Sequence, residues 1–136
     1  MNRLSGHILA CEIAGSLALV DVAVGDEHFT AMLLGIDADD GRWQPGTAVM
    51  LTFKETEVAL AKNLSGAISM RNRLKGVVTR IETGRLLSKV VFDMDGVAIS
   101  SVITTRSLQA LQLGQGDVVE GLVKSNEMSV VLESSA

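Results

Sequence analysis

The chain has 136 residues, of which 47% are hydrophobic and only 3% aromatic, and its formal net charge is −4. This length allows one ordinary domain or two very small ones, with cores of aliphatic side chains. The acidic balance and the scarcity of aromatic rings disfavour a nucleic-acid binder, which needs a basic stripe or stacking platforms. A single cysteine, Cys11, excludes an intrachain disulfide and favours a reducing, cytoplasmic location.

The apolar segment 4–24 follows Arg3, as the core of a secretory signal peptide would. His7, Glu12 and Asp21 interrupt it, and Gly15-Ser16 divides it into two expected β-strands. No run of about 20 uncharged apolar residues occurs in the chain. We therefore expect neither export nor direct insertion into a membrane.

The sequence repeats itself after 70 residues: positions 2–6 are Asn-Arg-Leu-Ser-Gly and positions 72–76 are Asn-Arg-Leu-Lys-Gly. The similarity is weak overall and is concentrated at the two ends of the repeat. The same offset also pairs Gly46 with Gly116, Val49 with Val119, Lys54 with Lys124 and Glu57 with Glu127. Such a duplication predicts two small domains of one fold, residues 1–66 and 67–136.

The second repeat alternates apolar and polar residues, and it predicts five strands. Asp95-Gly96 is a strong hairpin signal, and Val90, Phe92 and Met94 are expected on one buried face. Ser107 is a plausible helix cap, so a short helical turn is expected over 107–113. The expected strands are 76–81, 87–94, 97–104, 118–124 and 128–133.

The first repeat follows the same order, with Gly25-Asp26 in place of the Asp-Gly hairpin and a turn at 43–46. Five short strands with a helical turn after the third predict an oligonucleotide-binding (OB)-like barrel. The expected fold is therefore all-β, with two tandem OB-like five-stranded barrels, each with a short helical turn after the third strand. Because the connecting segment 61–68 is short, we expect the barrels to be closely coupled.

Motifs for catalysis are absent from the sequence. There is no phosphate-binding loop, no dinucleotide-binding glycine motif and no Cys/His cluster with metal spacing. Asp93 and Asp95 flank Met94 at the expected hairpin, where carboxylates are typical turn residues. We expect no enzyme, no catalytic residues and no direct metal ligands.

Polar residues cluster at three strand ends of the second repeat: 69–72 (Ser-Met-Arg-Asn), 104–107 (Thr-Thr-Arg-Ser) and 124–126 (Lys-Ser-Asn). Hydroxyl groups, backbone N–H groups and two kinds of cation suit a tetrahedral oxyanion, and the start of a helical turn near Ser107 would add a favourable dipole. The alternative is that these residues are caps, turns and solvated charges.

These segments resemble the molybdate-binding Mop domain, which belongs to the wider class of TOBE (transport-associated OB) domains. The family's Ser-Ala-Arg-Asn signature corresponds to 69–72, and its Val-Ile-Thr-x-x-Ser segment corresponds to 102–107. Its Leu-Gly-x-Gly-Asp turn corresponds to 113–117, and its Lys-Ala/Ser pair to Lys124-Ser125. The resemblance covers about residues 69–134.

The resemblance implies reversible binding of molybdate, and also of tungstate, without turnover. Ser69 Oγ and the Met70 backbone would donate to oxo groups, and Arg71 would bind or orient the ion. Four further residues would complete the shell: Thr104, Ser107, Lys124 and Ser125. Met70 replaces the family's Ala, which is harmless unless its side chain faces the ion.

In the family the shell is shared between subunits. The resemblance therefore implies a homo-oligomer, a dimer first and a trimer second, with sites at subunit boundaries. The Ser69–Arg71 group of one chain would meet the 104–124 group of another.

The first repeat departs from this pattern. The offset places residues 34–37 (Leu-Gly-Ile-Asp) opposite 104–107 and Glu55 opposite Ser125, while Lys54 is retained. Carboxylates in place of hydroxyl donors would repel a dianion, so we expect a degenerate first barrel in which Lys54 forms an ion pair. The alternative is that the ungapped alignment slips in this region.

The tandem arrangement resembles a storage protein, the sensor half of a molybdate-responsive repressor and the regulatory tail of a molybdate importer's ATPase. The sequence shows no helix-turn-helix pattern and no phosphate loop, so we do not expect a complete regulator. The position of the signature between the two barrels, with a degenerate first barrel, favours the importer tail or a free-standing relative. Two other classes remain: a ligand-free TOBE-like dimerisation module, and an OB-type oligonucleotide binder, which the charge disfavours.

Overall fold

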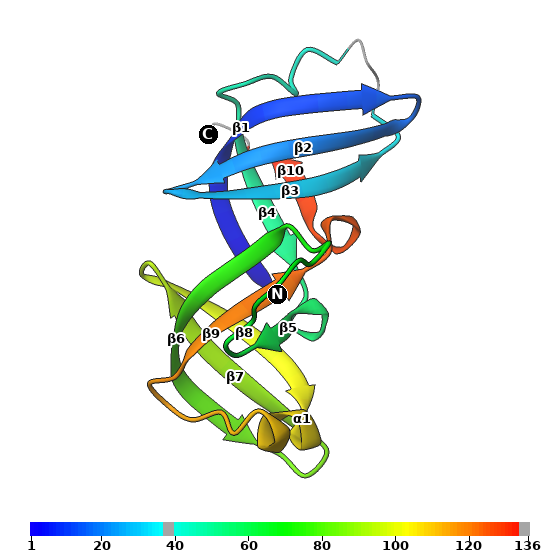
Figure 1. Ribbon diagram of the computed structural model, residues 1–136. Helices are drawn as coiled ribbons and strands as arrows, with labels where there is room; N and C mark the ends of the chain where they lie inside the picture. Colours follow the sequence, from blue (N-terminus) through cyan, green and yellow to red (C-terminus); the bar gives the residue numbers. More distant parts are fainter. Residues whose placement is uncertain (37–39, 134–136) are drawn as a thin grey trace. The chain divides into compact units, whose positions relative to one another are not determined.

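The computed structural model describes residues 1–36 and 40–133, and these form an all-β architecture (Figure 1). Two five-stranded sheets account for the strands, as the sequence predicted, and helical segments are few. The strands are β1 (Asn2–Ala14), β2 (Leu17–Val24), β3 (Glu27–Leu34), β4 (Ala48–Phe53), β5 (Ala59–Ala61), β6 (Asn72–Thr83), β7 (Leu87–Met94), β8 (Val97–Thr104), β9 (Val118–Val123) and β10 (Ser129–Leu132). The helical segments are α1 (Thr105–Ala110) and the 3₁₀ turns η1 (Glu55–Glu57) and η2 (Ser125–Glu127). Within the described ranges, no helix is both long and apolar enough to cross a bilayer.

Each repeat gives its last strand to the sheet of the other repeat. The sheet orders are β10-β4-β1-β2-β3 and β5-β9-β6-β7-β8. β5 pairs antiparallel with β9, with Leu60 opposite Gly121. β10 pairs antiparallel with β4, with Val130 opposite Leu51. The exchange occurs after β4 and β9, at Lys54 and Lys124.

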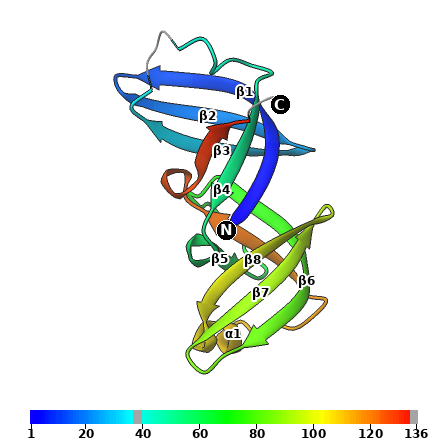
Figure 2. The ribbon, with the colours of Figure 1, turned by 180° about the vertical axis from the view of Figure 1, so that it is seen from behind.

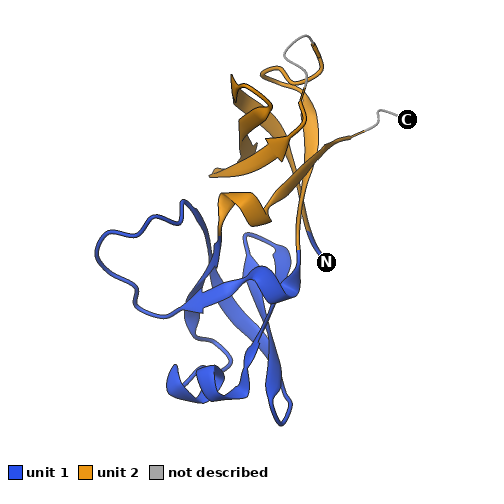
Figure 3. Cartoon of the chain, turned by 90° about the vertical axis from the view of Figure 1, so that its right-hand side faces the viewer, with its two compact units in different colours: residues 1–2, 54–123 blue, residues 3–53, 124–136 orange. Residues whose placement is uncertain are grey.

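Because of this exchange, the compact units differ from the sequence repeats 1–66 and 67–136. Unit 1 consists of residues 1–2 and 54–123, and unit 2 of residues 3–53 and 124–136 (Figure 3). Each unit therefore combines four strands of one repeat with the fifth strand of the other. We use these two names for the compact units throughout.

In unit 1, the strongest local signals of the sequence form as expected. β7 and β8 have the predicted bounds, and Asp95 and Gly96 turn between them with positive φ values of 50° and 88°. The predicted face of Val90, Phe92 and Met94 is buried. Period-two alternation with an Asp-Gly turn was therefore sufficient to place this hairpin.

The helix after β8 begins earlier than expected. It spans Thr105–Ala110, and Thr104 is its N-cap, so the predicted turn over 107–113 with Ser107 as cap is wrong. Thr104 Oγ1 accepts the N–H of Ser107 at 3.1 Å, the bond that a cap makes to the third helical residue. Figures 1 and 2 both show α1 at the end of the sheet where β8 ends.

Unit 2 contains the predicted turns at Gly15-Ser16 and Gly25-Asp26 between its first three strands. By the offset of 70 residues, the helical turn expected after β3 falls at 37–43. Residues 37–39 lie outside the described residues, and residues 40–43 form no helix. Residues 41–46 form turns that lead into β4.

The two units fill their cores with different side chains at corresponding positions. In unit 1, buried Phe92 lies against Gly121, where an added Cβ would be 2.9 Å from Phe92 Cζ. The residues 70 positions earlier, Val22 and Leu51, are both fully buried in unit 2. In unit 1 a large side chain on β7 therefore faces a glycine on β9. In unit 2 both corresponding positions have aliphatic side chains, which share the same core space.

Candidate functional site

The signature residues Ser69, Met70 and Arg71 lie in the segment 62–71, which connects β5 to β6 in unit 1. Ser69 and Arg71 are exposed, and Met70 is half-buried. Met70 and Arg71 line an open hollow of about 450 Å³, together with Gly66, Ala67, Ile68 and Arg73. The hollow thus presents polar groups of the signature to solvent.

Two arginines line this hollow, and only one of them is neutralised. Arg73 Nε and Nη2 donate to the two carboxylate oxygens of Glu120 at 2.7 and 2.8 Å. This bidentate pair lowers the pKa of Glu120 and raises that of Arg73. Arg71 makes no hydrogen bond or ion pair with any described residue, so its charge is available to an anion.

Thr104 and Ser107 lie together at the start of α1, and both are exposed. Thr104 Oγ1 donates to Ser107 Oγ at 2.8 Å and accepts the Ser107 N–H. Since Ser107 Oγ accepts here, its own proton is left to donate to a ligand. The structure therefore places two of the predicted site residues in direct contact.

Thr105 holds this helix start in place, a role that the sequence analysis missed. Its buried Oγ1 donates to the carbonyl of Gly84 at 2.8 Å and lies 2.8 Å from Ser88 Oγ. Its backbone N–H donates to the carbonyl of Leu86 at 2.8 Å. The run Thr-Thr-Arg-Ser contains three hydroxyl residues, and the sequence does not show which one faces the core.

Lys124 and Ser125, the remaining predicted site residues, belong to unit 2. Lys124 is exposed and directly follows β9, and Ser125 opens η2, which packs against β3. The other five predicted residues lie in unit 1. Neither unit by itself therefore contains the full predicted set, and within unit 1 no described hydrogen bond joins 69–71 to Thr104 or Ser107.

The exchanged segment of the first repeat places Lys54 and Glu55 in unit 1, where η1 packs against β8. Glu55 Oε1 pairs with Lys89 Nζ at 3.2 Å rather than with Lys54. No ion pair of Lys54 occurs among residues 1–36 and 40–133, so the expected pairing of Lys54 is wrong as far as Glu55 is concerned. Asp37, its other expected partner, lies outside the described residues.

Metal-ligating side chains do not gather in the part of the chain that the structure describes. No group of three or more His, Cys, Asp or Glu residues there is placed to hold a metal ion. Burial and the neighbouring Asp21 raise the pKa of the Cys11 thiol, which lowers its thiolate fraction.

Comparison with known proteins identifies the family. The TOBE domain model matches residues 1–60 and 68–130. Molybdenum-pterin-binding protein MopB of Rhodobacter capsulatus is 32% identical over 133 residues, which cover 90% of this chain and 48% of MopB. Molybdenum transport protein ModE of Herbaspirillum seropedicae is 25% identical over 135 residues, or 97% of this chain and 50% of ModE.

The chain thus spans about half the length of these curated relatives. A solved structure of ModG, a cytoplasmic molybdate-binding protein with molybdate bound, superposes with a TM-score of 0.91 at 26% identity. The match covers 97% of this chain and 96% of that chain, and it confirms the predicted tandem OB-like fold. Family model and fold agree with the motif resemblance: the chain belongs to the TOBE domain family and carries two matching segments.

Proposed function

We propose that the chain binds molybdate reversibly, without turnover, and binds tungstate at the same site. The observation that carries the proposal is Arg71, a signature arginine with no partner among the described residues, which lines an open hollow. The similarity to ModG over nearly the whole chain supports this ligand.

The chemistry of the proposed shell suits a tetrahedral dianion. Arg71 and Lys124 supply positive charge, and charge-assisted hydrogen bonds from cations to oxyanions are stronger than neutral ones. Ser69, Ser107 and Ser125 supply hydroxyl donors, and Met70 supplies a backbone N–H. Thr104 donates to Ser107 Oγ and so orients the Ser107 hydroxyl toward the ion. The same donors fit tungstate, which has the same shape and charge.

We infer that the shell is completed between copies of the chain, in a homo-oligomer that is a dimer or, second, a trimer. Two observations support this inference. The predicted residues are divided between the two units, and none of the described hydrogen bonds joins the signature group to the hydroxyl pair of α1. A symmetric assembly would bring the Ser69–Arg71 group of one chain to the 104–124 group of another.

The proposed role is cytoplasmic storage, homeostasis or sensing of molybdate. A second candidate is a regulatory or dimerisation module of a molybdate importer's ATPase or of a repressor. The half-length match to the molybdenum transport protein ModE favours this candidate. In both cases the chain binds rather than converts its ligand.

Titration calorimetry with molybdate, tungstate, sulfate and RNA, with light scattering in parallel, tests the proposal. Ligand at 100 times its dissociation constant adds about 2.7 kcal/mol of stability, which a thermal-shift assay also detects. We expect shifts with molybdate and tungstate. A ligand-free structural module would respond to none of the three ions, and an oligonucleotide binder would respond to RNA alone.

A further inference from the structure

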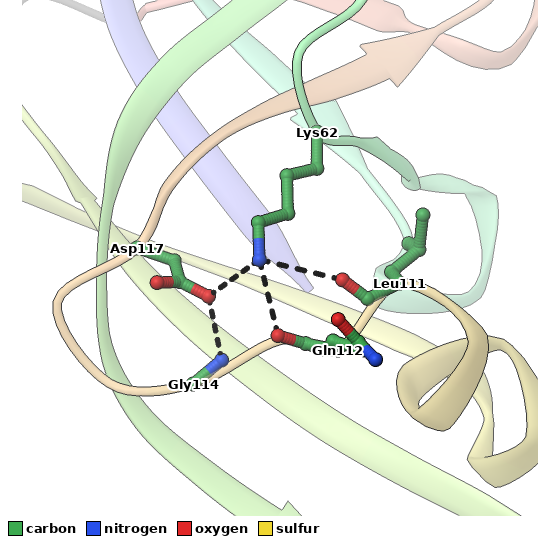
Figure 4. Close-up of polar contacts among 5 residues, drawn as sticks. All are labelled: Lys62, Leu111, Gln112, Gly114 and Asp117. Carbon is green, nitrogen blue, oxygen red and sulfur yellow. Dashed lines mark hydrogen bonds and ion pairs between the residues drawn. The ribbon is translucent and has the colours of Figure 1, made fainter.

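A half-buried lysine outside the predicted shell makes a cluster of contacts in unit 1. Lys62 Nζ donates to the carbonyl oxygens of Leu111 at 3.4 Å and Gln112 at 3.1 Å, and it pairs with Asp117 Oδ2 at 3.1 Å (Figure 4). Asp117 Oδ2 also accepts the N–H of Gly114 at 2.8 Å. The three N–H donors of the ammonium group are therefore all used. We call these five residues the Lys62 cluster.

The Lys62 cluster lies between the two parts of unit 1 that carry predicted site residues. Lys62 is the first residue after β5, and the segment that begins there ends in Ser69–Arg71. Leu111 is the C-cap of α1, whose other end carries Thr104 and Ser107. The cluster thus fastens the start of the signature segment to the helix that presents the two hydroxyls.

Because α1 is short, the contacts of Lys62 at its C-terminal end lie close in the chain to the hydroxyl pair at its start. The helix has only six residues, and the N–H of its C-cap Leu111 donates to the carbonyl of Ser107 at 2.9 Å. Gln112, whose carbonyl Lys62 also contacts, has a positive φ of 50°, so the chain turns sharply there. A cation at the carbonyl end of a helix is favourably placed, and its loss would loosen this turn.

The corresponding positions of unit 2 cannot form such a cluster. The offset of 70 residues places Leu132 opposite Lys62 and Thr47 opposite Asp117. Neither Leu132 nor Thr47 carries a charge, so these two residues form no ion pair, and unit 2 still has a five-stranded sheet. A five-stranded sheet of this order therefore forms in unit 2 without such a cluster, and the cluster occurs in the unit that carries the signature.

We propose that Lys62 is a positioning residue for the oxyanion site: through the C-terminal turn of α1 it holds the signature segment and the Thr104–Ser107 hydroxyl pair in register. Lys62 itself does not touch the ion. This inference rests on the proposed function, and it names a residue that the signature motif does not contain.

The test is calorimetric titration of the full chain with molybdate at constant ionic strength. Lys62→Met should weaken binding about tenfold, the low end of what loss of an outer-shell partner costs a bound metal. Lys75→Met, the same change at an exposed lysine of β6, removes the same charge and should alter affinity by less than about twofold. Lys62→Arg, which keeps the charge and the donors, should restore most of the loss.

Comparison with Thr104→Val separates positioning from a general loss of stability. If Lys62 acts through the hydroxyl pair, Lys62→Met should weaken binding less in the Thr104→Val background than in the wild type, since the effects of coupled residues do not add. Additive losses would overturn the proposal. So would equal affinities of Lys62→Met and Lys75→Met, and that result would leave the proposed function intact.

Absence of molybdate binding by the wild-type chain would overturn the proposed function and this inference together. If Lys62→Met does not fold, Asp117→Asn replaces it, because the amide oxygen can still accept the Gly114 N–H while the ion pair is lost. Unchanged molybdate affinity of folded Asp117→Asn would then contradict the proposal.

Discussion

Unit 1 and unit 2 have the same order of five strands, but unit 1 carries five of the seven residues expected to hold an anion, and unit 2 carries only Lys124 and Ser125. At the end of the third strand, unit 1 has the Thr104–Ser107 hydroxyl pair, whereas unit 2 has an exposed Leu34. Unit 1 also carries the Lys62 cluster, and unit 2 has Leu132 and Thr47 at those positions. The comparison teaches that this strand order also forms without either feature, which is why we propose a functional role for both.

The largest effect is expected from separating the repeats. The fragment 67–136 lacks β5 and with it Val58, which is buried in unit 1 and whose carbonyl accepts a hydrogen bond from Ser101 Oγ at 2.7 Å. We expect its free β10 to fill this position by exchange with a second copy, because β10 leads away from the sheet of its own repeat in the full chain. The fragment should therefore melt below the full chain, at a temperature that rises with protein concentration, and it should bind molybdate more weakly.

Calorimetric melts of the fragment and the full chain over a range of concentrations check this prediction. A monomeric fragment whose melting temperature equals that of the full chain, at every concentration, would show that the exchanged strand contributes little.

Removing the unpaired cation of the hollow should have the next largest effect. Arg71→Ala should weaken molybdate binding more than tenfold, because a hydrogen bond to a charged group contributes roughly 1.5–3 kcal/mol and tenfold corresponds to about 1.4. Arg85→Ala, at an exposed arginine of the β6–β7 turn, is the matched control and should bind normally. Thr104→Val should cause a smaller loss than Arg71→Ala. Titration curves that are identical for Arg71→Ala and Arg85→Ala would place the site elsewhere.

The close packing of Phe92 against Gly121 in unit 1 predicts that a larger residue at position 121 destabilises this unit. Gly121→Ala places a Cβ 2.9 Å from Phe92 Cζ and 3.1 Å from Val58 Cγ1, so it should destabilise the chain by about 1–3 kcal/mol. Adding Phe92→Leu should recover part of this loss by making room. Chemical denaturation of the single and double variants measures both effects. A Gly121→Ala variant as stable as the wild type would mean that this core relaxes freely.

The smallest effect concerns acid pH. The Gly114 N–H and Lys62 hold the pKa of Asp117 below its usual 3.8. Its contribution to stability is therefore complete above pH 3.8 and is lost as the pH falls through the lower folded-state pKa. Below pH 3.8 the wild type should lose stability more steeply than Asp117→Asn, which cannot titrate there. Parallel slopes in acid melts of the two proteins would argue against the Lys62–Asp117 pair.

The sequence predicted the hairpin of β7 and β8 residue by residue, because alternation and an Asp-Gly turn are local signals. It did not predict the exchange of β5 and β10. The two repeats have the same pattern, so local signals are identical whichever sheet the last strand joins. The N-cap was misplaced because Thr104 and Ser107 both have capping side chains, and only the backbone shows which one precedes the helix.

The sequence predicted which residues form the site, but it did not predict which of them the fold brings into one unit. Thr104 and Ser107 are neighbours, whereas Lys124 and Ser125 belong to the other unit as a result of the exchange. Lys62 could have been found from the repeat, since a lysine aligned with Leu132 is a marked difference. Its partners could not, because they lie 49 to 55 positions away and are brought near by tertiary structure.

The central claim is that one of the two repeats supplies the anion site and the other serves as its scaffold. Lys54 and Lys124 correspond in the two repeats, both are exposed, and each directly follows the strand after which the chain changes sheets. Matched titrations of Lys54→Ala and Lys124→Ala with molybdate therefore test the claim most directly. We predict a loss of more than tenfold for Lys124→Ala, a change within about twofold for Lys54→Ala, and one such site per chain. Equal losses, or a larger loss for Lys54→Ala, would show that the first repeat contributes ligands and would contradict the account.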